Sequence, residues 1–152
     1  IRQWFDGPIA LSGSIATGGA VLAAQAMGAD LAYIGSAFIA TEEARASDAY
    51  KQCIVDCSSD DIVYTNLFTG VHGNYLKPSI RSAGLDPDNL EHSDPTKMSF
   101  GSDYGSKGKA WKDIWGCGQG IAAVQAVVPA RELVARLKRE YEAAREQLLA
   151  TA

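Results

Sequence analysis

The sequence predicts an α/β fold with parallel strands, and three observations support this prediction. Residues 1–57 alternate two short apolar runs with two helix-like segments, which is the order of consecutive β/α units. Each apolar run ends at a glycine, as a buried strand does where the chain turns toward the next helix. The 152 residues are 47% hydrophobic and 21% charged, which suits a folded domain with a sizeable core.

The first β/α unit begins with an apolar strand over residues 8–12, which Gly13 ends. Thr17 and the glycines that follow it give a turn and a cap before a helix over residues 20–27. This helix is rich in alanine, the residue with the highest helix propensity, and Gly28 is placed to end it.

The second unit begins with a strand over residues 31–34, which stops at Gly35 and Ser36. We expect a helix from Glu42 to about Cys57, with Thr41 as its N-cap. Acidic residues in its first turn would interact favourably with the helix dipole.

The rest of the chain divides into two further segments. Residues 58–127 form a loop-rich insertion with one plausible strand over residues 62–65, because closely spaced glycines and prolines permit only short helices and turns after it. Residues 128–152 predict an amphipathic helix that starts near Pro129. Its apolar face would hold Leu133, Val134, Leu137, Tyr141 and Leu148.

Composition excludes several classes of function. The net charge of −4 argues against a nucleic-acid-binding surface, which needs clustered lysines and arginines. No apolar run approaches the ~20 residues of a membrane span. The first residues, from Ile1 on, lack a signal-peptide layout. We expect no membrane binding, and the cysteine count described next leads us to expect a cytoplasmic protein.

Three cysteines allow two interpretations. Cys53, Cys57 and a histidine could form a metal site, but their spacing matches no zinc motif. An odd count, with Cys117 alone between glycines, is better explained by reduced thiols that are at least partly buried. We therefore expect no metal.

A pair of glycine-rich turns carries the candidate chemistry. Gly13 and Ser14 follow the first strand, and Gly35 and Ser36 follow the second. In a parallel sheet both turns emerge at the carboxyl edge, where small residues let backbone amides approach a phosphate. The alternative is that the glycines only make tight turns. Two such turns on successive strands favour a phosphate site of the kind found after the last two strands of a β/α barrel.

Several stretches of this chain resemble the nitronate monooxygenases, formerly called 2-nitropropane dioxygenases. The stretches are LSGSI at residues 11–15, MGADLAYIGSAF at residues 27–38, the FIATE that overlaps it, and AWKDIWGCGQG at residues 110–120. The resemblance extends to the closing helix and so covers nearly the whole chain. It implies an FMN-dependent (β/α)8 TIM-type barrel. A complete barrel takes roughly 250 residues, so this chain would be its C-terminal part: the last two β/α units, a loop-rich excursion and a closing helix.

The resemblance also implies which residues bind the cofactor. The FMN contacts would fall on Gly13, Ser14, Tyr33, Ile34, Gly35 and Ser36. Ser14 stands where the family commonly has a glycine, and Tyr33 stands where glutamine is frequent. Gln119, between two glycines, is a further polar candidate near the flavin.

The activity implied by the resemblance is oxidation of an alkyl nitronate by O2 to a carbonyl compound and nitrite. The family's catalytic histidine lies upstream of this chain, so no catalytic residue is assigned here and the isolated chain is expected to be inactive. His72 does not match that histidine motif, and we expect it to be hydrogen-bonded or to face solvent, as we do His92.

Two other functions stay open. The chain could belong to another FMN barrel oxidoreductase, such as an enoyl-acyl-carrier-protein reductase, or it could be a non-catalytic phosphate-binding or oligomerising fragment. In each case part of a barrel would leave strand edges unpaired. We therefore expect it to associate with the missing N-terminal part of the barrel or with another copy. The lysines of residues 107–112 either face solvent or attract an anionic ligand.

Overall fold

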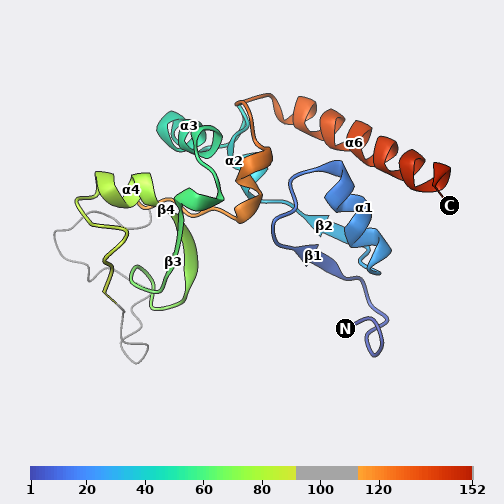
Figure 1. Ribbon diagram of the computed structural model, residues 1–152, viewed down its shortest axis with the longest axis horizontal. Coiled ribbons are helices and arrows are strands. Elements are labelled where there is room, and N and C mark those ends of the chain that lie inside the picture. Colours follow the sequence, from blue (N-terminus) through green and yellow to red (C-terminus); the bar gives the residue numbers. More distant parts are fainter. Residues whose placement is uncertain (92–112, 152) are drawn as a thin grey trace.

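Figure 1 presents the computed structural model of the chain, which describes residues 1–91 and 113–151. The N-terminal part is a β1–α1–β2 unit, with β1 at Ala10–Ser12, α1 at Gly18–Ala26 and β2 at Leu31–Tyr33. The two strands pair in parallel, with Ser12 opposite Tyr33. The predicted strand–helix–strand order and the parallel pairing are both confirmed.

One face of this two-stranded sheet is covered and the other is open. Leu11 and Ala32, which are partners in the register, are half-buried. The alternate positions on both strands are exposed, including Leu31 at 62% and Tyr33 at 65%. Parallel sheets are normally covered on both faces. The open face therefore presents apolar side chains that the described part of the chain leaves uncovered.

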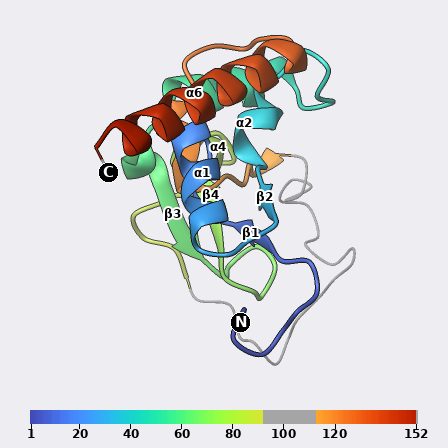
Figure 2. The same cartoon turned by 90° about the vertical axis from the view of Figure 1, so that its right-hand side faces the viewer.

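The long helix α6, at Ala130–Ala150, lies along α1, as both views show (Figures 1 and 2). The approach is closest at Gly18, where a Cβ atom would lie 2.1 Å from the carbonyl oxygen of Leu137. Only glycine allows this approach. The predicted apolar face is correct at the buried Leu133 but wrong at Val134 and Leu148, which are 53% and 60% exposed.

The helix expected to start at Glu42 starts six residues later, as α3 at Asp48–Asp56, so the predicted start is wrong. Ser47 is the N-cap, and its side chain accepts a hydrogen bond from the Tyr50 amide. Contacts with distant residues hold the intervening chain out of the helix. Thr41 forms a parallel bridge with Val128, and the Glu43 carboxylate accepts a hydrogen bond from the Ala130 amide across 2.8 Å.

The middle of the chain contains more regular structure than the sequence indicates. A 3-10 turn, η1 at Ser59–Asp61, precedes the predicted strand, which is confirmed as β3 at Ile62–Thr65. It pairs antiparallel with β4 at Gly73–Leu76, a strand that was not predicted, and α4 follows at Lys77–Ser82. The short helix α2 (Ser36–Ile39) and the 3-10 helix η3 (Gln119–Ala123) lie between this hairpin and the β1–β2 unit (Figure 1).

The core draws on all parts of the chain. Its buried side chains come from α2, α3, β4, η3, α6 and the residues that directly follow α2 and η3: Ala37, Ala40, Ile54, Leu76, Ile121, Val124 and Leu133. The three cysteines pack against this cluster. In the described residues, no helix is both long and apolar enough to cross a membrane.

Candidate cofactor-binding site

The turn after β1 has an unusual backbone. Gly13 has a φ of 115° and Ser14 a φ of 53°, so two successive residues occupy the left-handed region. That region favours glycine, which explains Gly13 directly. A Cβ atom at Gly13 would meet no other atom within 4 Å. The turn therefore leaves its backbone open to a ligand.

The turn after β2 is open in the same way. Gly35 would also meet no atom within 4 Å if it carried a Cβ. Because β1 and β2 are parallel neighbours in register, the two turns leave the same edge of the sheet. Ile34 is half-buried, whereas Tyr33 lies on the open face of the sheet. The structure thus brings together the residues of both predicted turns.

A third segment joins the two turns. The Gly118 amide donates a hydrogen bond to the Ser36 hydroxyl at 2.7 Å. Two residues later, a Cβ at Gly120 would lie 3.1 Å from the backbone carbon and oxygen of Ser14, which is tighter than an ordinary contact, so glycine favours this close packing. The alternating glycines at 116, 118 and 120 were the only sequence signal for this contact.

Gln119 lies between these two glycines, beside both turns. Its side-chain oxygen accepts a hydrogen bond from the Asn74 side chain at 3.3 Å. This bond ties the β3–β4 hairpin to the candidate site. Asn74 was not predicted, because its role depends on a partner 45 residues away.

Two amides at the start of α1 already have acceptors within the described residues. The Gly18 amide donates to the Glu140 carboxylate at 2.8 Å, and the Thr17 hydroxyl accepts from the Ala20 amide. Thr17 is thus the predicted N-cap. The negative charge of Glu140 sits at the positive end of the helix dipole. The Gly18 and Ala20 amides are therefore engaged within the chain.

Two of the three partly buried cysteines lie close together. The Sγ atoms of Cys53 and Cys57 are 3.6 Å apart, and all three cysteines are free and partly buried. Burial, as the largest cause, raises the pKa of both Cys53 and Cys117 from the ordinary 9.0 to about 12. Across residues 1–91 and 113–151, no group of three histidine, cysteine, aspartate or glutamate side chains is arranged to hold a metal ion.

The remaining predicted residues lie apart from the turns or outside the described residues. His72 is exposed, and its ring stacks on Tyr64 with the centroids 4.9 Å apart. Trp115 stacks on Tyr50 at 5.1 Å. His92 and residues 107–112 lie outside the described residues.

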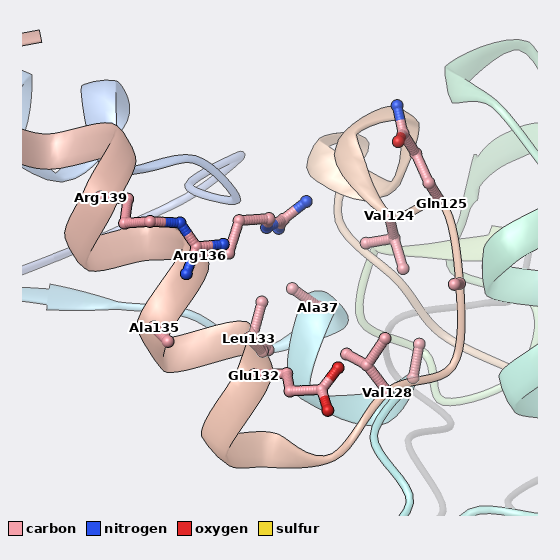
Figure 3. Close-up of a pocket in the computed structure, with 11 residues that line it drawn as sticks. Ala37, Val124, Gln125, Val128, Glu132, Leu133, Ala135, Arg136 and Arg139 are labelled. Carbon is pink, nitrogen blue, oxygen red and sulfur yellow. The ribbon is translucent and has the colours of Figure 1, made fainter. Parts of the chain in front are cut away.

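A pocket of about 320 Å³ lies between α2, α6 and the chain that follows η3 (Figure 3). Its apolar wall includes Val124, Val128 and Leu133, and Arg136 and Arg139 of α6 border it. Arg136 is already held by the carbonyl oxygens of Ala123 and Ala16, at 2.8 and 3.1 Å. This arginine therefore braces the chain just after the first turn.

Comparison with known proteins identifies the family. The sequence model of the family described as nitronate monooxygenase matches residues 1–140. The chain belongs to the nitronate monooxygenase family. The nitronate monooxygenase of Paraburkholderia phytofirmans is 30% identical over 146 residues, which cover 93% of this chain and 40% of that protein.

Solved structures agree with this family assignment. The nitroalkane oxidase from Streptomyces ansochromogenes superposes with a TM-score of 0.69 and 28% identity, covering 96% of this chain and 42% of that one. FabK from Thermotoga maritima superposes with a TM-score of 0.71 over 97% of this chain and 48% of that one, and its 20% identity shows a shared fold alone. This nitronate monooxygenase family chain thus spans less than half the length of the proteins it resembles.

Proposed function

We propose that this chain is the FMN-phosphate-binding portion of an FMN-dependent nitronate monooxygenase, which oxidises alkyl nitronates with O2 to a carbonyl compound and nitrite. One observation carries the proposal: two strand-end turns lie at one edge of a parallel sheet, with open space above Gly13 and Gly35. Family membership supports the choice of reaction. The FMN would supply the redox chemistry, and the protein would position it.

The residues of the turns fit a phosphate group. Backbone amides at Gly13 and Gly35 can approach an anion because no side chain stands in the way. The hydroxyls of Ser14 and Ser36 add donors beside them. Serine in place of the family's glycine at position 14 keeps the close approach, since Ser14 already adopts the left-handed backbone that the turn needs.

The side chains next to the turns are proposed to contact the rest of the cofactor. Tyr33 and Ile34 precede the second turn, and the open face of the sheet carries the Tyr33 ring. Gln119 is held beside both turns by Asn74. The full set proposed for FMN is Gly13, Ser14, Tyr33, Ile34, Gly35, Ser36 and Gln119.

The open face of β1 and β2 supports a protein partner for this chain. Two parallel strands with exposed Leu31 and Tyr33 bury little apolar surface by themselves, and further strands or helices would cover them. We propose that the N-terminal part of the barrel covers this face and provides the acid–base residue, with a second copy of the chain as the alternative. Residues 1–57 would then be the last β/α units, 58–127 the rim and 128–152 the closing helix. The free cysteines fit a cytoplasmic protein.

Titration with FMN and with riboflavin tests the cofactor proposal. Riboflavin has the same ring system without the phosphate, so a phosphate site makes the chain bind FMN more tightly. Gly35→Val would place a side chain in the open space above the turn and should lower FMN affinity by roughly tenfold or more. Gly19→Ala is the control, since its Cβ meets only Ala144 at 3.9 Å. Equal binding of FMN and riboflavin by the unmodified chain would contradict the proposal.

The reaction is tested in the longest polypeptide that contains this sequence. We expect nitrite release from an alkyl nitronate in the presence of O2 and no need for a reduced nicotinamide. NADPH-dependent reduction of an enoyl thioester would instead indicate the reductase alternative. Neither activity, together with no FMN binding, would indicate a non-catalytic fragment.

A further inference from the structure

We propose that the backbone amide of Gly118 is a positioning group that aims the Ser36 hydroxyl proton at the bound phosphate. Gly118 belongs to residues 118–120, here called the strap, which hold the two turns at a fixed spacing. This inference rests on the proposed function and adds to it a third chain segment about eighty residues downstream of the second turn. None of the resemblance-based site assignments includes Gly118.

The hydrogen-bonding capacity of a serine hydroxyl carries the first step. A hydroxyl has one proton to donate and two lone pairs that accept. The Gly118 amide occupies a lone pair of the Ser36 oxygen at 2.7 Å, so the hydroxyl proton must point away from Gly118. Within residues 1–91 and 113–151, the hydrogen bonds found include no acceptor for that proton. The proton is therefore available to an anion at the turn.

The spacing of the two turns carries the second step. Gly118 contacts the second turn at Ser36, and Gly120 packs against the backbone of Ser14 in the first turn. One short segment thus touches both turns and fixes their separation. β1 and β2 are only three residues long each, so few hydrogen bonds between them fix the spacing of the turns. The contacts of the strap add to these bonds.

The strap is itself held in place by β4. The Leu76 amide donates to the Trp115 carbonyl at 2.8 Å, and the Cys117 amide donates to the Asn74 carbonyl at 3.2 Å. These two bonds attach the chain just before the strap to the edge of β4. The β3–β4 hairpin therefore supports the candidate phosphate site through its backbone.

A double-mutant cycle tests whether Gly118 acts through Ser36. Gly118→Pro replaces the amide proton, which points at the Ser36 oxygen, by the ring Cδ, so Ser36 loses its donor and must turn away. The φ of −95° at this position lies near the range of proline. Gly118→Ala keeps the amide, and its Cβ meets the Ser36 oxygen at an ordinary 3.5 Å. We expect Gly118→Pro and Ser36→Ala each to weaken FMN binding about tenfold, and the double variant to be no weaker than either one. The control variant Gly118→Ala should keep most of the FMN affinity of the unmodified chain.

Three readouts keep structural effects separate. Riboflavin affinity should stay unchanged in every variant, because riboflavin has no phosphate for Ser36 to contact. Amide hydrogen exchange at Gly118 should accelerate in Ser36→Ala without ligand, since its acceptor is gone. Thermal unfolding identifies any variant that fails to fold, and Ser36→Ala and Ser36→Thr then test the same hydroxyl without touching the strap.

Each outcome decides between the inference and the proposed function. Unchanged FMN affinity in Gly118→Pro, or losses that multiply in the double variant, would overturn the role of Gly118 while leaving FMN binding intact. If the unmodified chain binds inorganic phosphate but prefers FMN no more than riboflavin, the flavin proposal fails. In that case phosphate affinity across the same variants decides the role of Gly118. Binding of neither FMN nor phosphate would overturn both.

Discussion

The carboxylate of Glu140 accepts a hydrogen bond from the backbone amide of Gly18 across 2.8 Å, although 122 residues separate the two in the chain. This bond caps the N-terminus of α1 from the middle of α6. Arg136, one turn earlier on α6, lies 3.6 Å from the same carboxylate and reaches the carbonyl oxygen of Ala16. The closing helix therefore supports the chain between the first turn and α1.

Removing this cap should destabilise the fold. We expect Glu140→Ala to lower the free energy of unfolding by about 1–2 kcal/mol, because the Gly18 amide loses its acceptor and the Arg136 guanidinium loses its ion-pair partner. Urea unfolding measures the change. Glu142→Ala is the matched control, since it removes only a surface pair with Lys138 and should change stability by less than about 0.5 kcal/mol. Equal losses in the two variants would contradict the capping role.

Two neighbouring glycines in α1 should respond in opposite ways to alanine. A Cβ at Gly18 would lie 2.1 Å from the Leu137 oxygen and 2.2 Å from the Tyr141 nitrogen, so Gly18→Ala must push α6 away and should cost more than about 2 kcal/mol. At Gly19 the nearest atom is the Ala144 Cβ, at 3.9 Å. Gly19→Ala should stabilise the helix by about 0.5–1 kcal/mol. Thermal and urea unfolding of both variants check the sign of each change.

The elements that the sequence predicts correctly are those with local signals. The β1–α1–β2 unit was predicted because its apolar runs, its alanine-rich helix and the Thr17 cap all lie within a few residues of each other. The start of α3 was predicted wrongly because Thr41 and Glu43 have the properties of helix-start residues but are bound by Val128 and Ala130. No local pattern contains that information.

The same distinction applies to the candidate site. The two turns could be identified from glycines and serines that follow strands, so their common edge was predictable. The contributions of Gly118, Gly120 and Asn74 were not, because each depends on a contact with a distant part of the chain. β4 was missed for a related reason: Gly73 and Asn74 have low strand propensity, and pairing with β3 overrides it.

Acid should weaken the attachment of the N-terminal segment to β2. The Ile9 amide and the Arg2 guanidinium, which lies 2.5 Å away, both hold the pKa of the Asp30 carboxyl below its ordinary value of 3.8. Since the folded pKa is lowered, the stabilisation is present above the ordinary value and is lost as the pH falls through the folded value.

Thermal unfolding from about pH 7 down to about pH 2 should therefore show wild type and Asp30→Asn converging at the acidic end. Arg2→Ala should keep part of this pH dependence, because the Ile9 amide is the larger cause of the lowered pKa. A constant difference between wild type and Asp30→Asn over the whole range would contradict the assignment.

The thiols should be unreactive in the folded chain and should make it sensitive to alkali. Burial raises the pKa of Cys53 and Cys117 to about 12, so near pH 8 their thiolate fraction is roughly a thousandfold below that of an ordinary thiol. Alkylation by iodoacetamide should accelerate strongly on unfolding in urea.

The same burial should make the folded chain sensitive to alkali. Because the pKa of Cys53 is raised in the folded chain, the free energy of unfolding that depends on its neutral thiol is present below pH 9.0 and is lost as the pH rises toward about 12. Cys53→Ala should reduce this alkaline loss, whereas native alkylation as fast as in urea would show that the thiols are not buried in solution.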